Sequence, residues 1–248
     1  MSMYIAIISV GLGFMVLERV MPDQTLSKSS GWWIRAVCFN LMQLGVVLLG
    51  GVAWDVYLQR VSLFSMTDLG WTSLAQGLFG YVVSTFIYYW WHRVRHSSDM
   101  LWLTLHQVHH SPARLETITA FYKHPLELTL NSILSGLIGY TLLGLDIQGA
   151  GWLTVFSALG EFFYHMNVRT PRWVGYLIQR PEMHRVHHER GVHASNYGDL
   201  PIWDLMFGTY RNPDRYDGPC GFEAERETLI IPLLTFRDVN KNADGAQI

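Results

Sequence analysis

Two copies of one short pattern decide how this chain folds: His106-Gln107-Val108-His109-His110 and His184-Arg185-Val186-His187-His188. Both copies read H-x-x-H-H, and residues three and four apart share one face of a helix. Each copy can therefore direct two or three imidazole rings at one point, which is how proteins build metal sites. The repetition favours this interpretation over unrelated core or surface histidines.

Further histidines accompany the two copies. Nine of the eleven histidines fall into four clusters along the chain: His92 and His96; then His106, His109 and His110; then His165; and last His184, His187 and His188. One ion rarely takes more than about six ligands, so nine converging imidazoles imply two metal ions. Glu161 stands one helical turn before His165, and we expect it either to join the ligands or to orient that imidazole.

The composition indicates a membrane protein. Half of the residues are hydrophobic and only 15% are charged. Five apolar stretches stand out, at residues 4–17, 34–58, 71–91, 126–145 and 152–166, and a membrane-spanning helix needs about 20 residues. We therefore expect an all-α fold, a polytopic membrane bundle of about four to five helices with a cytoplasmic, histidine-rich helical cap.

The histidine clusters also predict the topology. They can meet only if residues 126–145 and 152–166 form a hairpin that leaves the cluster and returns to it. Lys and Arg prefer cytoplasmic loops, and many of them lie near the clusters, among them Arg93, Arg114, Lys123 and Arg185. Convergence places all clusters on one side of the membrane, and the basic residues agree with it and identify that side as cytoplasmic; with five crossings the N-terminus lies outside the cytoplasm.

The rest of the sequence predicts one membrane-embedded domain over residues 1–248. Residues 1–91 are expected to form N-terminal membrane helices, residues 92–237 the histidine-box region and residues 238–248 a tail. The net charge of −2 gives no indication of a nucleic-acid partner. Two cysteines are too few for a disulfide framework.

Iron suits this number of histidines best. Zinc sites usually take four ligands, and the zinc protease motif H-E-x-x-H is absent because Val192 stands where its second histidine would be. A dinuclear iron site could activate dioxygen against a lipid C–H bond. Two alternatives remain: a zinc-binding membrane hydrolase or structural metalloprotein, and a metal transporter, for which residues 34–58 and 126–145 offer few polar side chains.

Several segments around the histidines are familiar in order and spacing. They read YYWWHRVRH at residues 88–96, LW at 101–102 before HQVHHS at 106–111, KHPLE at 123–127, HMN at 165–167, PEMHRVHH at 181–188, NYG at 196–198, WD at 203–204 and FGTY at 207–210. Over roughly residues 80–237 the chain resembles the fatty acid hydroxylase (sterol desaturase) superfamily.

The resemblance implies an integral membrane di-metal oxygenase that hydroxylates, desaturates or otherwise oxidises a lipid such as a fatty acyl chain or a sterol. It implies that the nine clustered histidines bind two iron ions, for which zinc can substitute in purified protein, and that O2 is the co-substrate. No cytochrome b5-like segment is recognisable. We therefore expect a separate electron donor of ferredoxin or cytochrome b5 type with its reductase, and a bacterial inner membrane, or the endoplasmic reticulum of a eukaryote.

Some positions need separate treatment. Several relatives carry H-x-x-x-H at the third cluster, where this chain has Glu161 in the first of those places. His124 matches the family's His-Pro pair and is expected to be a ligand or a hydrogen-bond donor beside one. Asn167, Asn196 and Asp204 are expected to support ligands or to cap helices.

Overall fold

The computed structural model describes residues 2–192 and 194–241. His193 and residues 242–248 of the expected tail lie outside the described residues. Within those ranges the regular structure is helical, with an isolated antiparallel bridge between Glu189 and Cys220 and no strand. The all-α prediction is confirmed.

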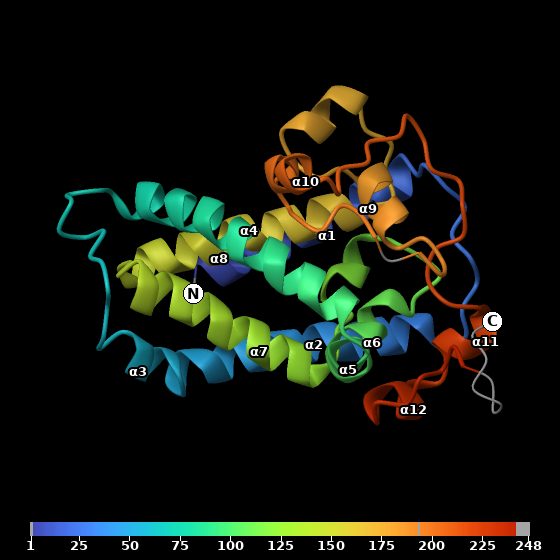
Figure 1. Ribbon diagram of the computed structural model, residues 1–248, viewed down its shortest axis with the longest axis horizontal. Coiled ribbons are helices and arrows are strands. Elements are labelled where there is room, and N and C mark those ends of the chain that lie inside the picture. Colours follow the sequence, from blue (N-terminus) through green and yellow to red (C-terminus); the bar gives the residue numbers. More distant parts are fainter. Residues whose placement is uncertain (1, 193, 242–248) are drawn as a thin grey trace.

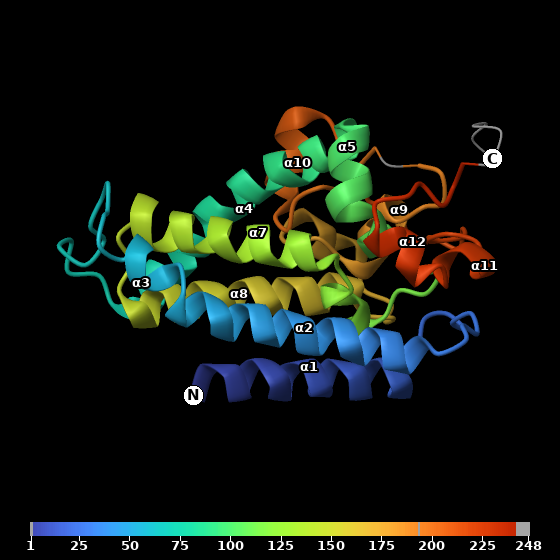
Figure 2. The same cartoon turned by 90° about the horizontal axis from the view of Figure 1, so that it is seen from below.

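The described chain places long helices at each of the five apolar stretches. They are α1 (Ser2–Val20), α2 (Trp32–Val52) with the short α3 (Asp55–Leu58), α4 (Ser73–Ser97), α7 (Pro125–Gly136) continued by the π-helical η3 (Leu137–Leu142), and α8 (Ile147–His165). They run along the long axis of the molecule (Figures 1 and 2). Two segments, Met3–Val20 and Trp32–Leu58, are long and apolar enough to cross a membrane.

The predicted hairpin is present, because α7 and α8 run in opposite directions. The start of α8 is fixed to the start of α4 by Asp146, whose carboxylate accepts the Gly149 amide at 2.6 Å and the hydroxyl of Ser73 at 2.9 Å. Helices α4 and α8 then pack closely, since a Cβ atom on Gly77 of α4 would lie 2.3 Å from the Cβ of Trp152 of α8. Their far ends, which carry the first and third histidine clusters, consequently meet.

Shorter helices gather at this end of the bundle. The segment that carries His106, His109 and His110 is built from α5 (Asp99–Leu101), the π-helical η1 (Trp102–His106) and α6 (Gln107–His110). The other elements are the 3-10 helices η2 (Thr117–Phe121) and η4 (Arg172–Tyr176), then α9 (Pro181–His187), α10 (Pro201–Phe207), α11 (Ala224–Glu227) and α12 (Ile230–Leu234). Figure 1 shows α9, α11 and α12 at the same end as α6.

A separate apolar core supports these short helices. It contains Trp32 and Phe39 of α2, Val108 of α6, Tyr122 after η2 and Leu233 of α12, all buried. The ring centroids of Phe39 and Tyr122 lie 4.3 Å apart. The second apolar stretch of the sequence thus contributes its N-terminal half to the support of the histidine region.

Candidate metal centre

The structure brings all nine clustered histidines together in two adjacent groups. The five-histidine group contains His92, His96, His106, His110 and His187, and the four-histidine group contains His109, His165, His184 and His188. Within each group, one ring nitrogen from every member lies within 4.8 Å of all the others. The groups touch where the rings of His110 and His188 stack, with centroids 4.1 Å apart.

The two H-x-x-H-H segments contribute to both groups. In the first segment, His106 and His110 are one helical turn apart and enter the five-histidine group, whereas His109 enters the four-histidine group. The second segment does the reverse, since His184 and His188 enter the four-histidine group and His187 the other. The helical face explains the pairing of residues four apart, and the residue between them projects to the neighbouring group.

The electrostatic environment keeps several of these imidazoles neutral. Burial, followed by nearby histidines, lowers the pKa of His109, His110 and His184 well below the ordinary value of 6.5. Burial and the neighbouring Arg95 do the same to the pKa of His106. Neutral imidazole is the form that binds a metal ion, so the donors are ready at neutral pH.

Backbone carbonyl groups fix which ring nitrogen carries the proton. The Nδ1 atoms of three imidazoles face carbonyl oxygens: that of Tyr197 at 2.8 Å for His92, that of Ser195 at 2.7 Å for His187, and that of Glu161 at 2.7 Å for His165. A carbonyl oxygen only accepts, so Nδ1–H donates in each case. The Nε2 lone pairs therefore remain for a metal.

The arrangement of the histidine Nε2 atoms is suited to binding metal ions. Nε2 of His184 faces Nε2 of His165 at 3.0 Å and Nε2 of His188 at 3.1 Å, a concentration of donor atoms on one point. Nε2 of His106 is buried without a hydrogen-bond partner among the described residues. A metal would satisfy these atoms, and metal–nitrogen bonds of about 2.1 Å place opposed donors about 4.2 Å apart, close to the observed spread.

A buried carboxylate orients His106. Oε1 of Glu127 lies 3.0 Å from Nδ1 of His106 and also pairs with the Arg95 guanidinium. All three side chains are almost completely buried. Because the guanidinium only donates, Glu127 is the acceptor that both neighbours share. Nδ1 of His106 lies 3.0 Å from both Oε1 of Glu127 and Nη1 of Arg95, and its Nε2, which has no hydrogen-bond partner among the described residues, remains for the five-histidine group.

Glu161 and His124 lie outside both histidine groups. Oε1 of Glu161 accepts a hydrogen bond from Nζ of Lys123 at 2.6 Å, and its Oε2 is 3.8 Å from Nδ1 of His165. His124 is the N-cap of α7, where its Nδ1 accepts the Leu126 amide at 3.1 Å. The backbone carbonyl of Glu161, rather than its carboxylate, therefore orients His165, and His124 stabilises the start of α7.

Asn196 and Asp204 hold the loop behind His92. Asp204, within the first turn of α10, accepts the amide of Tyr197 at 2.8 Å, and the carbonyl of Tyr197 in turn faces His92. Asn196 has a left-handed backbone (φ 56°), and its side chain bonds the carbonyl of Met183 at 2.9 Å. Both side chains thus support ligand-bearing segments, and neither is a helix N-cap.

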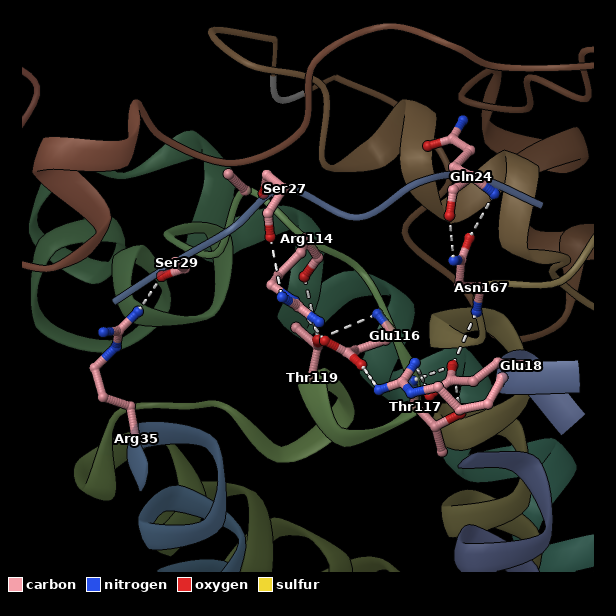
Figure 3. A network of polar contacts seen from close by, with 12 residues as sticks. Glu18, Gln24, Ser27, Ser29, Arg35, Arg114, Glu116, Thr117, Thr119 and Asn167 are labelled. Carbon is pink, nitrogen blue, oxygen red and sulfur yellow. Dashed lines mark hydrogen bonds and ion pairs between the residues drawn. The ribbon is translucent and has the colours of Figure 1, made fainter. Parts of the chain in front are cut away.

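Asn167 belongs to a polar network that ties the end of α1 to the histidine-bearing segments (Figure 3). Glu18 is completely buried, and it accepts the amides of Thr117 at 2.9 Å and Asn167 at 3.1 Å. Nδ2 of Asn167 donates to the carbonyl of Gln24 at 2.8 Å, and its Oδ1 accepts from Arg185 of α9 at 2.9 Å. The residues after the second and third clusters are thereby joined through α1.

Sequence reasoning missed Glu127 and Glu18 as parts of the centre's surroundings. A signal existed for Glu127, because a carboxylate directly after the His124-Pro125 helix start falls within the first turn of α7. Glu18 gave a weaker signal, a charged residue at the end of an apolar helix. Its partners, at the start of η2 and just after α8, are about 100 and 150 residues away, and the pattern of α1 does not reveal them.

The fold and the centre define a class: a helical protein whose buried polyhistidine centre suits two metal ions beside apolar, membrane-length helices. The family model described as fatty acid hydroxylase matches residues 77–209, more than half of the chain. The chain belongs to the fatty acid hydroxylase family, as the sequence segments predicted.

Similar curated proteins are enzymes that act on lipids by their names. An ornithine lipid hydroxylase of Rhizobium tropici is 29% identical over 81% of this chain and 64% of its own length. The alkylglycerol monooxygenase of Homo sapiens is 30% identical over 71% of this chain and 38% of its own. A very-long-chain aldehyde decarbonylase of Oryza sativa is 29% identical over 55% of each chain. The chain thus spans less than two thirds of these relatives, and no solved structure matches.

Proposed function

We propose that this protein is a membrane-bound di-iron oxygenase that inserts oxygen into a C–H bond of a lipid. The observation that carries the proposal is the convergence of nine histidines in two adjacent groups. The hydroxylase and monooxygenase names of the relatives support insertion of oxygen, and desaturation by the same centre is the related outcome. Their names also support a lipid substrate.

The nine histidines would hold two iron ions, which supply the activation of dioxygen when bound. In the overall reaction one oxygen atom enters the C–H bond and the other leaves as water, with two electrons and two protons taken up. A separate ferredoxin- or cytochrome b5-type donor with its reductase would supply the electrons. Glu127 would position His106, and the backbone carbonyls of Tyr197 and Ser195 would keep the Nδ1 protons of His92 and His187 in place, which leaves the Nε2 atoms of these histidines for the ions.

We further propose that the long helices cross the membrane with the histidine groups on the cytoplasmic side. The two membrane-length segments Met3–Val20 and Trp32–Leu58 support the setting. α4, α7 with η3, and α8 lie alongside them (Figure 2). The exposed side chains of α4 between Leu74 and Val94, among them Val82 and Phe86, are apolar, as contact with lipid requires.

The decisive experiment measures metal content and lipid oxidation together. His109→Ala and His187→Ala remove a member of the four- and five-histidine group respectively. Each should abolish bound iron and dioxygen-dependent lipid turnover, whereas the matched variant His124→Ala, outside both groups, should keep the metal. Full activity of either group variant would refute the proposal.

A second measurement separates the oxygenase from a zinc hydrolase. Protein purified without added metal is assayed for lipid turnover with and without dioxygen. An oxygenase consumes dioxygen in step with product and regains activity when zinc-loaded protein is reconstituted with iron. Turnover that persists without dioxygen would identify a hydrolase.

A further inference from the structure

The outer face of α10 is apolar although no part of the described chain covers it. Ile202, Leu205 and Met206 point away from the bundle with 51%, 50% and 63% of their surface exposed. The charged residue of this helix, Asp204, is instead completely buried. A helix that meets water keeps polar side chains on its outer face, so this surface is suited to an apolar environment.

The inner face of α10 is apolar as well, and it fixes the helix against α4. The Trp203 ring packs on Phe86 with centroids 4.9 Å apart, and the Phe207 ring packs on Trp90 at 4.8 Å. The indole nitrogen of Trp203 also donates to the hydroxyl of Thr85 at 2.9 Å. The outer face is consequently held rigidly at the surface.

The neighbouring helix η4 extends the same surface. Trp173, Tyr176 and Leu177 are 63%, 57% and 67% exposed, and η4 packs against α10. We call the combined surface the apolar platform; its members are Trp173, Tyr176, Leu177, Ile202, Leu205 and Met206. Large exposed apolar patches mark contact with a membrane, a ligand or a protein.

The position of the platform favours a membrane. Val82, Phe86 and Trp90 follow one another at four-residue spacing on the exposed face of α4 and lead directly to α10. Along the long axis of the molecule, α10 lies between the two ends of α1 rather than beyond them (Figures 1 and 2). A bilayer that surrounds α1 and α4 would therefore reach α10.

Charge at the border of the platform suits lipid headgroups. Arg169 and Arg172 precede Trp173 in the chain, Arg211 follows Tyr210, and all three arginines are exposed. Trp and Tyr beside Arg are typical of the interface between hydrocarbon and headgroups, where the rings contact acyl chains and the guanidinium groups contact phosphate.

We propose that the apolar platform is inserted into the cytoplasmic leaflet, at the depth where acyl chains meet headgroups. The inference rests on the membrane setting proposed above. Through Asp204 and Tyr197, α10 is linked to His92 of the five-histidine group. The histidine centre thus lies beside the leaflet that the platform occupies, and the lipid substrate enters from that leaflet.

Site-directed spin labelling of the full chain in phosphatidylcholine–phosphatidylglycerol nanodiscs tests the platform. In a Cys38→Ala background, nitroxides are attached to Leu177→Cys and Met206→Cys. The membrane reference is Val82→Cys on α4. The aqueous reference is Asp217→Cys, whose native side chain is 59% exposed. Collision rates with dioxygen, which partitions into lipid, are compared with those of the water-soluble complex Ni-EDDA.

We expect the labels at 177 and 206 to behave as the label at 82 does, with dioxygen collisions dominant. Ni-EDDA collisions at 177 and 206 like those at 217, with 82 still in lipid, would overturn the platform alone. Protection from both reagents would reveal a protein partner and also overturn it. Exposure of 82 to Ni-EDDA would refute the membrane setting, and the platform with it.

A second measurement decides the question if a labelled variant does not fold. Fluorescence quenching by brominated phosphatidylcholine is compared between the wild type and Trp173→Phe, and the difference isolates Trp173. Quenching of this difference signal by the bromolipid supports insertion. A difference signal quenched only by aqueous iodide contradicts it.

Discussion

Replacement of Glu127 by glutamine should weaken metal binding without removing any histidine. The amide keeps the volume of the carboxylate but lacks the negative charge that Arg95 and His106 share. His106 then faces a neutral amide, whose single oxygen is a weaker acceptor than the carboxylate. Loss of such a partner lowers metal affinity by about 10- to 100-fold. Glu127→Ala should in addition leave the buried Arg95 unpaired, which destabilises a protein by about 3–5 kcal/mol.

The assay titrates purified protein with chelators of graded strength and measures bound iron by mass spectrometry. Glu116→Gln is the matched control, because Glu116 is an equally buried carboxylate that pairs with Arg19 and Arg114 and with no histidine (Figure 3). It should lower the thermal midpoint yet leave metal affinity unchanged. The reasoning fails if Glu127→Gln binds iron as tightly as the wild type, or if both variants lose metal equally.

Three other outcomes are expected. His124→Ala should reduce stability by about 1 kcal/mol through loss of the α7 N-cap, while bound metal stays constant. His106→Ala should lose metal. Equal metal loss in both variants would contradict the role of His124 as a helix cap outside the metal centre. Gly77→Ala should lower the unfolding free energy by about 1–3 kcal/mol because its Cβ meets Trp152, and Gly13→Ala, whose Cβ meets nothing within 4 Å, should not. Burial lowers the pKa of His109 and His184, so at acidic pH the unfolded chain binds protons that the folded centre does not. Stability and metal retention should therefore fall as the pH drops below 6.5, the ordinary pKa of histidine. Thermal midpoints and metal content measured across that range should show this loss, and a midpoint that rises on acidification would refute it.

The sequence predicted the parts of the fold that depend on local patterns. Apolar stretches located the long helices, and the need for the histidines to meet predicted the hairpin of α7 and α8. The π-helical turns at Trp102–His106 and Leu137–Leu142 were not predicted, because apolar periodicity does not report which carbonyl each amide selects. The placement of His109 and His110 in different histidine groups was not predicted either, because it depends on how α6 and α9 approach each other.

Long-range polar contacts were beyond the reach of sequence patterns. Asp23 pairs with Arg185 across 162 residues, and Glu18 reaches Asn167 across 149. Such pairs form only after the helices have packed, and neither partner carries a local signal of the other. Glu161 shows the opposite case, since its spacing from His165 correctly placed the two side chains on one helical face.

The exchange of histidines between the two H-x-x-H-H segments has a consequence for biosynthesis. His187 completes the group that otherwise uses residues 92–110, and His109 completes the group that otherwise uses residues 165–188. A nascent chain that has not yet released α9 from the ribosome therefore has neither group complete. Both halves of the centre become whole in the same late event, when α9 docks against α6, so a partly synthesised chain holds no finished centre.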